Sequence, residues 1–290
     1  SNAMARTKRV PAKKKPAIKL EIPKEVNVPP ENLSDYCICL FGEKGVGKTS
    51  LAAQFDDSLV MMLEPKRRNL SIRQVNIEPS SIKQLNEGHT DITPWRYVQE
   101  YIHAAMDDET VGTVVIDTID RAYEACLNHH CYQKGLNHPS DANDYGATWA
   151  AIKADFEATM NQLLYNDMGL IFISHAHLRE VEAHDGVEQW IPTCSPASWK
   201  YLKAVCDFAL YYGYDGTDRA ITLRNNSLVW SACGTENNFL TTSGEPIGQF
   251  STGTTHSEAY QNLTKAFRNE LEDESILEPA VKKERKSNRK

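Results

Sequence analysis

The sequence lacks a hydrophobic run long enough to cross a membrane. Hydrophobic residues make up 41% of its 290 residues, but no apolar stretch approaches the roughly 18 residues that a spanning helix requires. Residues 1–20 hold seven Lys or Arg residues and no acid, so they also lack the apolar centre of a secretion signal. We therefore expect a protein of the cytoplasm that makes no contact with membranes.

Cysteines are too few and too scattered for a disulfide scaffold. The chain has seven, an odd number, and contains no C-x-x-C pair, so reduced thiols are the simplest interpretation. A predicted helix and the loop after it do concentrate possible zinc ligands, namely Cys126, His129, His130, Cys131 and His138. Because their spacing matches no regular zinc motif, we favour a buried cysteine face with solvated histidines and keep zinc as the alternative.

Acidic residues are absent from the first 20 residues and nearly absent from the last nine. Residues 282–290 contain six Lys or Arg residues and one acid, which leaves 19 basic and 38 acidic residues in 21–281. An acidic body with a net charge of −19 thus lies between two basic ends. Such ends can bind the phosphate backbone of nucleic acid through counterion release. Disordered tails that only keep the protein in solution are an equal alternative.

What the sequence does contain is a complete phosphate-binding loop. Residues 42–49 match the P-loop pattern G-x-x-x-x-G-K-[ST] between an apolar strand and a helix. The backbone N–H groups of such a loop and the N-terminus of its helix converge on one anion. We expect Lys48 to contact the β- and γ-phosphates and Thr49 to coordinate Mg²⁺. The predicted nucleotide-binding residues are Gly42, Glu43, Lys44, Gly45, Val46, Gly47, Lys48, Thr49 and Ser50.

Strands and helices alternate along most of the chain. Apolar runs predict strands at 37–41, 59–63, 113–117, 170–174 and 208–212. Helical periodicity predicts helices at 47–55, 94–105, 119–132, 145–165 and 257–271. Two further strands, 219–224 and 227–232, are expected to form a hairpin around Asn225 and Asn226. The pattern predicts a three-layer α/β fold with a mainly parallel central sheet covered by helices on both faces.

The same observations divide the chain into four parts. Residues 1–33 are expected to form a basic disordered arm, and the first three residues look like a scar left by tag cleavage. The P-loop ATPase domain should span 34–255. A C-terminal helix within 256–281 and a basic tail at 282–290 should follow it.

Candidate catalytic residues lie at the carboxyl ends of predicted strands, where parallel sheets bind ligands. Asp117 closes a strand of the kind that supplies the second magnesium carboxylate of P-loop proteins, with a helix cap as the alternative. Thr118 follows it where many ATPases have a Glu, so the carboxylate that activates water must come from elsewhere. Glu64 is the best candidate and Asp120 the next. His175 is positioned to sense the γ-phosphate, or else is a capping or satisfied histidine.

These features resemble the RecA-type ATPase core, with a P-loop strand followed by strands that end in Glu64, Asp117 and Ser174-His175. More narrowly, Tyr145-Gly146 at the start of a long helix that leads into this last strand looks like phage-encoded RecA-like proteins linked to single-strand annealing and recombination. The resemblance covers about residues 36–232.

The resemblance implies ATP and Mg²⁺ as cofactors, and the catalytic set becomes Lys48, Glu64, Asp117 and His175. It also implies single-stranded DNA as a partner, a single-stranded-DNA-binding protein or recombination protein as a further one, and assembly of copies into a ring or filament. A phage-encoded protein of this kind would act in the cytoplasm of its bacterial host.

Three functions compete on this basis. We favour a magnesium-dependent ATPase that acts on single-stranded DNA in recombination or replication. The first alternative is a nucleotide-dependent switch or loader that hydrolyses slowly and binds a protein partner. The second is a small-molecule kinase, although the sequence lacks an Arg-rich lid. No N-K-x-D guanine motif occurs, so ATP is the expected nucleotide.

A positive charge that acts on a neighbouring copy is the last element expected of such an ATPase. The candidates are Arg179, Lys200, Lys203 and Arg224, which the sequence does not rank. Trp190 and Trp199 lie near two of these lysines, but we interpret them as packing residues rather than base-stacking ones.

Overall fold

A computed structural model of the chain describes residues 18–65, 69–80, 82–88, 92–180 and 188–277. The chain splits into two units, Ser1–Pro30 and Glu31–Lys290. Residues 18–30 of the first unit contain no helix or strand. The predicted basic tail and most of the predicted basic arm lie outside the described residues. No helix in the described part of the chain is long and apolar enough to cross a membrane.

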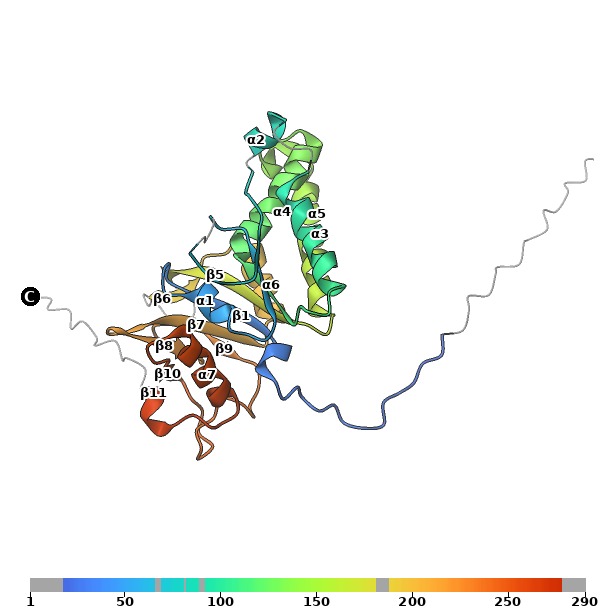
Figure 1. The fold of residues 1–290 in the computed structure, drawn as a ribbon. Coiled ribbons are helices and arrows are strands. Elements are labelled where there is room, and N and C mark those ends of the chain that lie inside the picture. The colour runs from blue at the N-terminus through green and yellow to red at the C-terminus, as the bar shows by residue number, and fades with distance from the viewer. Residues whose placement is uncertain (1–17, 66–68, 81, 89–91, 181–187, 278–290) are drawn as a thin grey trace, which may run out of the picture. The chain divides into compact units, whose positions relative to one another are not determined.

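One sheet organises the described part of the second unit (Figure 1). Its strands are β1 (Cys37–Gly42), β2 (Ser58–Met62), β3 (Gln74–Asn76), β4 (Thr113–Asp117), β5 (Gly169–Glu180), β6 (Glu188–Pro192), β7 (Phe208–Asp215), β8 (Asp218–Thr222), β9 (Ala232–Cys233), β10 (Gln249–Ser251) and β11 (Ile276–Leu277). Their order is β11-β10-β8-β7-β1-β5-β4-β2-β3, with β6 paired to β5 and β9 to β7.

The strands from β7 to β3 in this order run parallel, and the strands beyond β7 are antiparallel. The predicted α/β fold with a mainly parallel sheet is therefore confirmed. β5 lies between β1 and β4, so one strand separates the P-loop from Asp117.

The helices are α1 (Lys48–Ala52), α2 (Ile82–Asn86), α3 (Pro94–Met106), α4 (Ile119–Lys134), α5 (Ala147–Leu164), α6 (Pro196–Val205) and α7 (His256–Phe267). Short 3₁₀ segments lie at Leu33–Asp35, Pro139–Ala142 and Asp273–Ser275. Thr93 and Thr118 cap α3 and α4 by accepting a backbone N–H group, as expected for Thr at a helix N-terminus. The predicted helices are confirmed, although the first ends at Ala52 instead of 55 and the last at Phe267 instead of 271.

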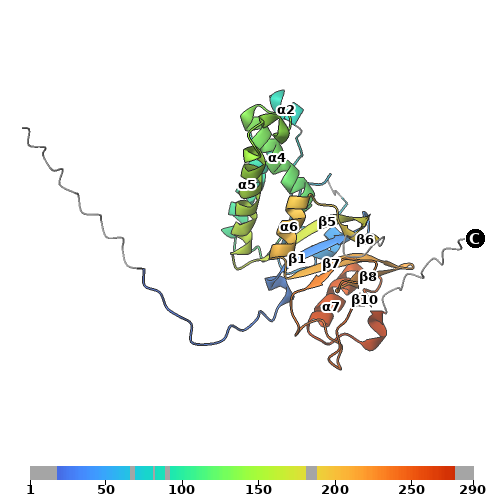
Figure 2. The same cartoon turned by 180° about the vertical axis from the view of Figure 1, so that it is seen from behind.

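Alternating side chains of the parallel strands build two separate cores. On β1, Cys37, Cys39 and Phe41 face the core formed with α3, α4, α5 and α6. Ile38 and Leu40 point to the other face and pack with α1 and α7. A period of two residues is what a strand buried on both faces requires. Figure 2 shows the two helical layers on opposite sides of the sheet.

The hairpin predicted from 219–224 and 227–232 is wrong. β8 instead forms its hairpin with β7, because Gly216 supplies the positive φ angle of 65° that a tight turn between them needs. The Asn226 side chain accepts the N–H groups of Leu228 and Val229, at 2.8 and 2.9 Å, and so holds the later segment as a turn. β9 then pairs with β7 rather than with β8.

β5 extends well past the predicted end at 174. Its first half lies in the parallel sheet, and its second half, Ala176–Glu180, pairs with β6 in antiparallel fashion. The sequence alternates polar and apolar residues there instead of continuing the apolar run, so the parallel-strand pattern ends before the strand does.

Candidate active site

The P-loop connects the end of β1 to the first turn of α1. Gly45 and Gly47 both have positive φ angles, 86° and 107°, which residues with a side chain rarely adopt. A Cβ atom on Gly47 would also lie 2.0 Å from Cε1 of His256. Glycine is therefore required at Gly47 for two independent reasons.

Lys48 is buried at the centre of this loop, with 5% of its surface exposed. Its Nζ atom donates to the carbonyl oxygens of Gly42 and Glu43, at 2.9 and 2.8 Å. These bonds fix the ammonium group beside the N-terminus of α1, where an anion is attracted by both.

Thr49 and Asp117 bring two oxygen atoms together from different elements. The Thr49 hydroxyl donates to Oδ2 of Asp117 at 2.5 Å, and Asp117 is 3% exposed. Burial raises the pKa of Asp117, while the Thr49 hydrogen bond opposes that rise. The capping alternative for Asp117 is excluded, because Thr118 is the N-cap of α4.

Glu64 follows β2 and is held by three side chains. Its Oε1 atom accepts from the Thr118 hydroxyl at 3.1 Å and lies 3.2 Å from Nε2 of His175. Arg121 Nε lies 3.9 Å from the other carboxylate oxygen. The hydrogen bond from His175, with smaller help from Thr118 and Arg121, lowers the pKa of Glu64 against the effect of burial. Glu64 is therefore a carboxylate at neutral pH.

His175 lies inside β5, opposite Gly42 in the register with β1. A position within a strand excludes the helix-cap alternative for this residue. Its Nδ1 atom is buried and has no hydrogen-bond partner among the described residues. His175 therefore connects Glu64, which its Nε2 atom contacts, to the end of β1 where the P-loop begins.

Asp120, the second candidate for water activation, is engaged elsewhere. Its carboxylate accepts from the Ser174 hydroxyl at 3.3 Å and from the Thr193 hydroxyl at 2.8 Å. Burial raises the pKa of Asp120, and these two bonds partly offset the rise. Asp120 ties α4 to β5 and to the segment after β6, and it does not line the cavity described next.

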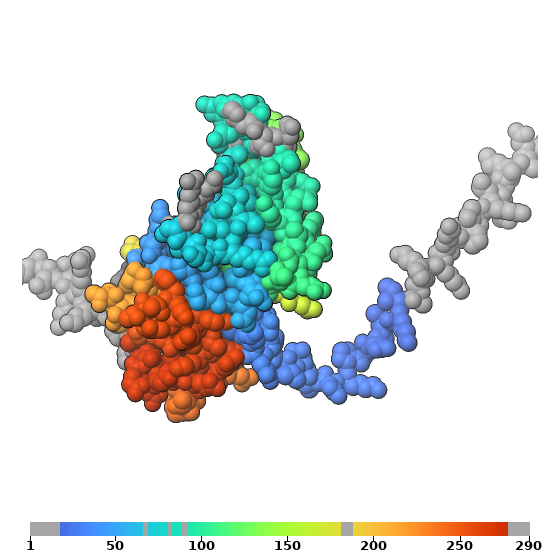
Figure 3. All heavy atoms as spheres, viewed as in Figure 1, coloured from blue at the N-terminus to red at the C-terminus, as the bar shows by residue number. Residues whose placement is uncertain are grey.

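A cavity of about 210 Å³ joins the P-loop to the catalytic candidates. Its walls include Gly45, Gly47, Lys48, Thr49, Ser50, Glu64, Asp117 and His175. Of the predicted nucleotide-binding residues, Gly42, Glu43, Lys44 and Val46 do not line it. Figure 3 shows the surface of the P-loop region, in blue, bordered by the red C-terminal segment and the cyan segment that follows β2.

Sequence reasoning missed three residues that line the cavity from outside the P-loop and the predicted catalytic positions. Asn69, Leu70 and His256 line it, and Nδ1 of His256 lies 3.0 Å from the Tyr212 hydroxyl. Burial, together with Arg219, lowers the pKa of His256. Arg219 of β8 also donates to the Val46 carbonyl at 2.8 Å. No motif marked Arg219 and His256, because they are far from the P-loop in sequence and approach it, at Val46 and Gly47, only in the folded chain.

The four candidates for a positive charge that acts on a neighbouring copy lie in different environments. Arg179 and Lys200 are exposed, Lys203 lies 4.5 Å from the centre of the Trp199 ring, and Arg224 donates to the carbonyl of Phe239 at 3.3 Å. Arg224 is therefore held inside its own chain.

Both tryptophans that we considered for base stacking pack internally. Trp190 stacks on Tyr211 with ring centres 6.3 Å apart, and Trp199 meets Trp230 edge to face at 5.8 Å. The interpretation of these side chains as packing residues is confirmed.

The five possible zinc ligands named from the sequence are not one cluster. His129 bonds to the Thr93 hydroxyl at 2.7 Å, and His138 caps a 3₁₀ segment by accepting from the backbone of Ser140. Cys131 is fully buried. Only Cys126 and His130 come together, and they do so with Asp155, a residue that the sequence did not indicate.

Comparison with known families adds one match. Residues 34–232 fit the family model described as an AAA domain. This span is more than half of the chain and contains every catalytic candidate, whereas His256 lies beyond it. No curated protein matches the sequence.

Proposed function

Because the chain belongs to the AAA-domain family of P-loop ATPases, we propose that it binds and hydrolyses ATP with Mg²⁺ and acts on single-stranded DNA in phage-type recombination or replication. The observation that carries the hydrolytic part is the Glu64–His175 pair in the same cavity as Lys48 and Asp117. A pure binding module would not need an ionised, hydrogen-bonded carboxylate at that place.

The residues fit ATP and Mg²⁺ by the chemistry of their donors. The P-loop has no room for a Cβ atom at Gly47, and Lys48 is buried beside it. Both features suit the binding of a phosphate chain. The paired oxygens of Thr49 and Asp117 suit Mg²⁺, which prefers oxygen ligands. When bound, Mg²⁺ would neutralise negative charge on the phosphate oxygens.

Glu64 is the group that would accept a proton from the attacking water. It is ionised at neutral pH, and the hydrogen bonds from Thr118 and His175 fix the direction of the carboxylate. A base must be held in place as well as ionised to contribute. We assign His175 as the residue that positions Glu64. Because His175 is part of β5, a change at Glu64 would be felt by that strand.

The DNA part of the proposal depends on the resemblance to RecA-like phage proteins and on charge. The body of residues 21–281 has a net charge of −19, so it repels nucleic acid outside a local groove. The basic ends would then supply most of the attraction. A ring or filament of several copies would place these ends along the same strand.

The decisive experiment is steady-state ATP hydrolysis with Mg²⁺, with and without single-stranded DNA, using Lys48→Ala as the blank. We expect hydrolysis that DNA stimulates and that the variant lacks. Tight ATP binding with slow turnover indifferent to DNA would instead favour the nucleotide-dependent switch or loader. Phosphate transfer to a small molecule would favour the kinase.

A further inference from the structure

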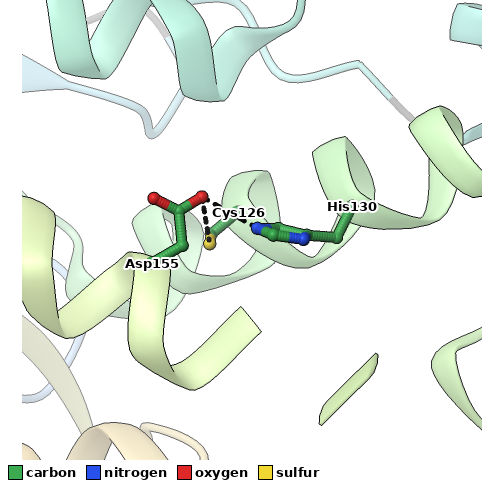
Figure 4. Close-up of side chains that lie close together, drawn as sticks. All are labelled: Cys126, His130 and Asp155. Carbon is green, nitrogen blue, oxygen red and sulfur yellow. Dashed lines mark hydrogen bonds and ion pairs between the residues drawn. The ribbon is translucent and has the colours of Figure 1, made fainter. Parts of the chain in front are cut away.

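Three possible metal ligands meet in the helical layer, in a cluster separate from the active-site cavity. Cys126 and His130 are four residues apart on α4, and Asp155 lies on the facing helix α5 (Figure 4). Residues at this spacing share one face of a helix. One ligand atom from each side chain lies within 4.8 Å of the others.

The distances within this cluster approach those of a tetrahedral zinc site. Nε2 of His130 lies 2.8 Å from Oδ2 of Asp155, and the Cys126 sulfur lies 3.9 Å from the same oxygen. Tetrahedral Zn²⁺, with Zn–N and Zn–O bonds of about 2.1 Å and a Zn–S bond of about 2.3 Å, separates N from O by about 3.4 Å and S from O by about 3.6 Å. The observed N–O distance is about 0.6 Å shorter and the S–O distance about 0.3 Å longer than these values, and side-chain rotation can supply both changes.

Hydrogen bonds from neighbouring side chains also orient the Asp155 carboxylate, as they do for metal-ligating carboxylates. Its Oδ2 atom accepts from the indole N–H of Trp95 at 3.0 Å, and its Oδ1 atom accepts from the Gln99 amide at 3.3 Å. Trp95 is fully buried on α3. The carboxylate therefore has a fixed direction that does not depend on His130.

We propose that Cys126, His130 and Asp155 bind one zinc-class divalent cation that crosslinks α4 to α5 and, through Asp155, to α3. The thiolate and imidazole donors select Zn²⁺ or Co²⁺ over Mg²⁺, so the site would not compete with the P-loop for its cation. Three protein ligands leave a fourth position for water. The His130 and Asp155 side chains are 17% and 28% exposed, so the cluster is partly open to solvent on their side.

The simpler interpretation is a metal-free pair of His130 and Asp155 beside an inert thiol. Burial and the nearby Asp155 raise the pKa of the Cys126 thiol, and its sulfur lies 3.5 Å from the Ile152 carbonyl as a weak donor. Metal binding would release this thiol proton to solvent while the Cys126 sulfur bonds to the cation. The two interpretations therefore differ in whether Cys126 is a ligand.

Cobalt binding to the reduced full-length protein tests the proposal, because thiolate–Co²⁺ charge-transfer absorption reports a sulfur ligand directly. We expect about one equivalent of Co²⁺ to produce this absorption in the wild type and Zn²⁺ to abolish it, with excess Mg²⁺ present throughout. Cys126→Ser should remove the absorption, and His130→Gln or Asp155→Asn should weaken binding at least tenfold.

Matched controls separate this site from other cysteines. Cys131→Ser removes a buried thiol from the same helix, and Cys206→Ser removes one that lies 3.7 Å from the Cys37 sulfur; both should keep the absorption. Circular dichroism identifies any variant that fails to fold, and His130→Gln then replaces Cys126→Ser as the test. Absence of the absorption in the folded wild type, or its persistence in folded Cys126→Ser, would overturn the proposal.

Discussion

At the scale of single residues, Glu64 concentrates contacts from three elements. Thr118 of the β4–α4 junction, His175 of β5 and Arg121 of α4 all approach its carboxylate. A surface glutamate before a proline would not collect partners in this way. Glu64 could therefore contribute both to ATP turnover and to stability, and the two contributions can be measured separately.

Glu64→Gln should leave nucleotide binding intact and reduce ATP turnover about 100-fold or more, the usual loss when a general base is removed. The amide keeps the shape and one acceptor oxygen but takes up no proton. Steady-state turnover alongside ATP affinity measures both effects. Glu124→Gln, on the exposed carboxylate next to Arg121, is the matched control. Normal turnover by Glu64→Gln would mean that another group activates the water.

Lys48→Ala should weaken ATP binding or abolish turnover. The variant removes a buried ammonium group and leaves the carbonyls of Gly42 and Glu43 without its hydrogen bonds. Equilibrium binding of ATP is the measurement, with Lys44→Ala in the same loop as the control. Equal effects of the two substitutions would show that general loop charge, rather than Lys48, holds the phosphates.

The stability that Glu64 contributes should depend on pH. Its pKa is lowered in the folded protein from the ordinary value of 4.5, so the ionised form favours folding. This contribution is complete above pH 4.5 and is lost as the pH falls through the lower folded-state value. Urea unfolding of the wild type and Glu64→Gln should give a constant gap from pH 7 to about pH 5.5 and a shrinking gap below 4.5. A gap that widens in acid would contradict the assignment.

At the scale of elements, the P-loop is braced by parts of the chain that follow it by more than 160 residues. Arg219 of β8 holds the Val46 carbonyl, and His256 at the start of α7 closes the space beside Gly47. The conformation of the P-loop therefore depends on contacts from β8 and α7 as well as on its own eight-residue pattern.

Gly47→Ala should therefore be more damaging than Gly45→Ala. Both positions have positive φ angles, which cost an alanine about 1–2 kcal/mol, but only the Gly47 Cβ would collide with His256. A Cβ at Gly45 meets no atom within 4 Å. The midpoint temperature of thermal unfolding and the affinity for ATP should both fall further for Gly47→Ala than for Gly45→Ala. Equal losses would indicate that His256 gives way without cost.

The sequence predicted the elements that carry a continuous local signal. The buried parallel strands, the capped helices and the P-loop all have such signals, and Glu64 and Asp117 followed from their positions at strand ends. His175 was placed after the predicted end of its strand, but it lies inside β5. The 219–232 hairpin was wrong because an apolar run does not reveal which strand it pairs with. His256, Arg219 and Asp155 were missed because their roles arise only when distant segments pack together.

At the scale of the whole molecule, charge is divided between an acidic body and two basic ends. A variant without residues 4–20 and 282–290 should bind single-stranded DNA more weakly and lose part of the salt dependence of that binding. Fluorescence anisotropy across a salt series measures both quantities. Ends of scrambled sequence and equal charge are the control, and should restore both. An unchanged salt slope in the truncated variant would place the DNA contacts on the body.

β5 is one unbroken strand from Gly169 to Glu180. Its first half is clamped between β1 and β4, while its second half pairs with β6 and, through β6, is hydrogen-bonded to residues 228–230. His175 lies where the clamp ends. The β5–β6 ribbon therefore starts beside the phosphate-binding cavity, and any shift of the His175 backbone would be shared by the whole of β5 and by β6, which pairs with it.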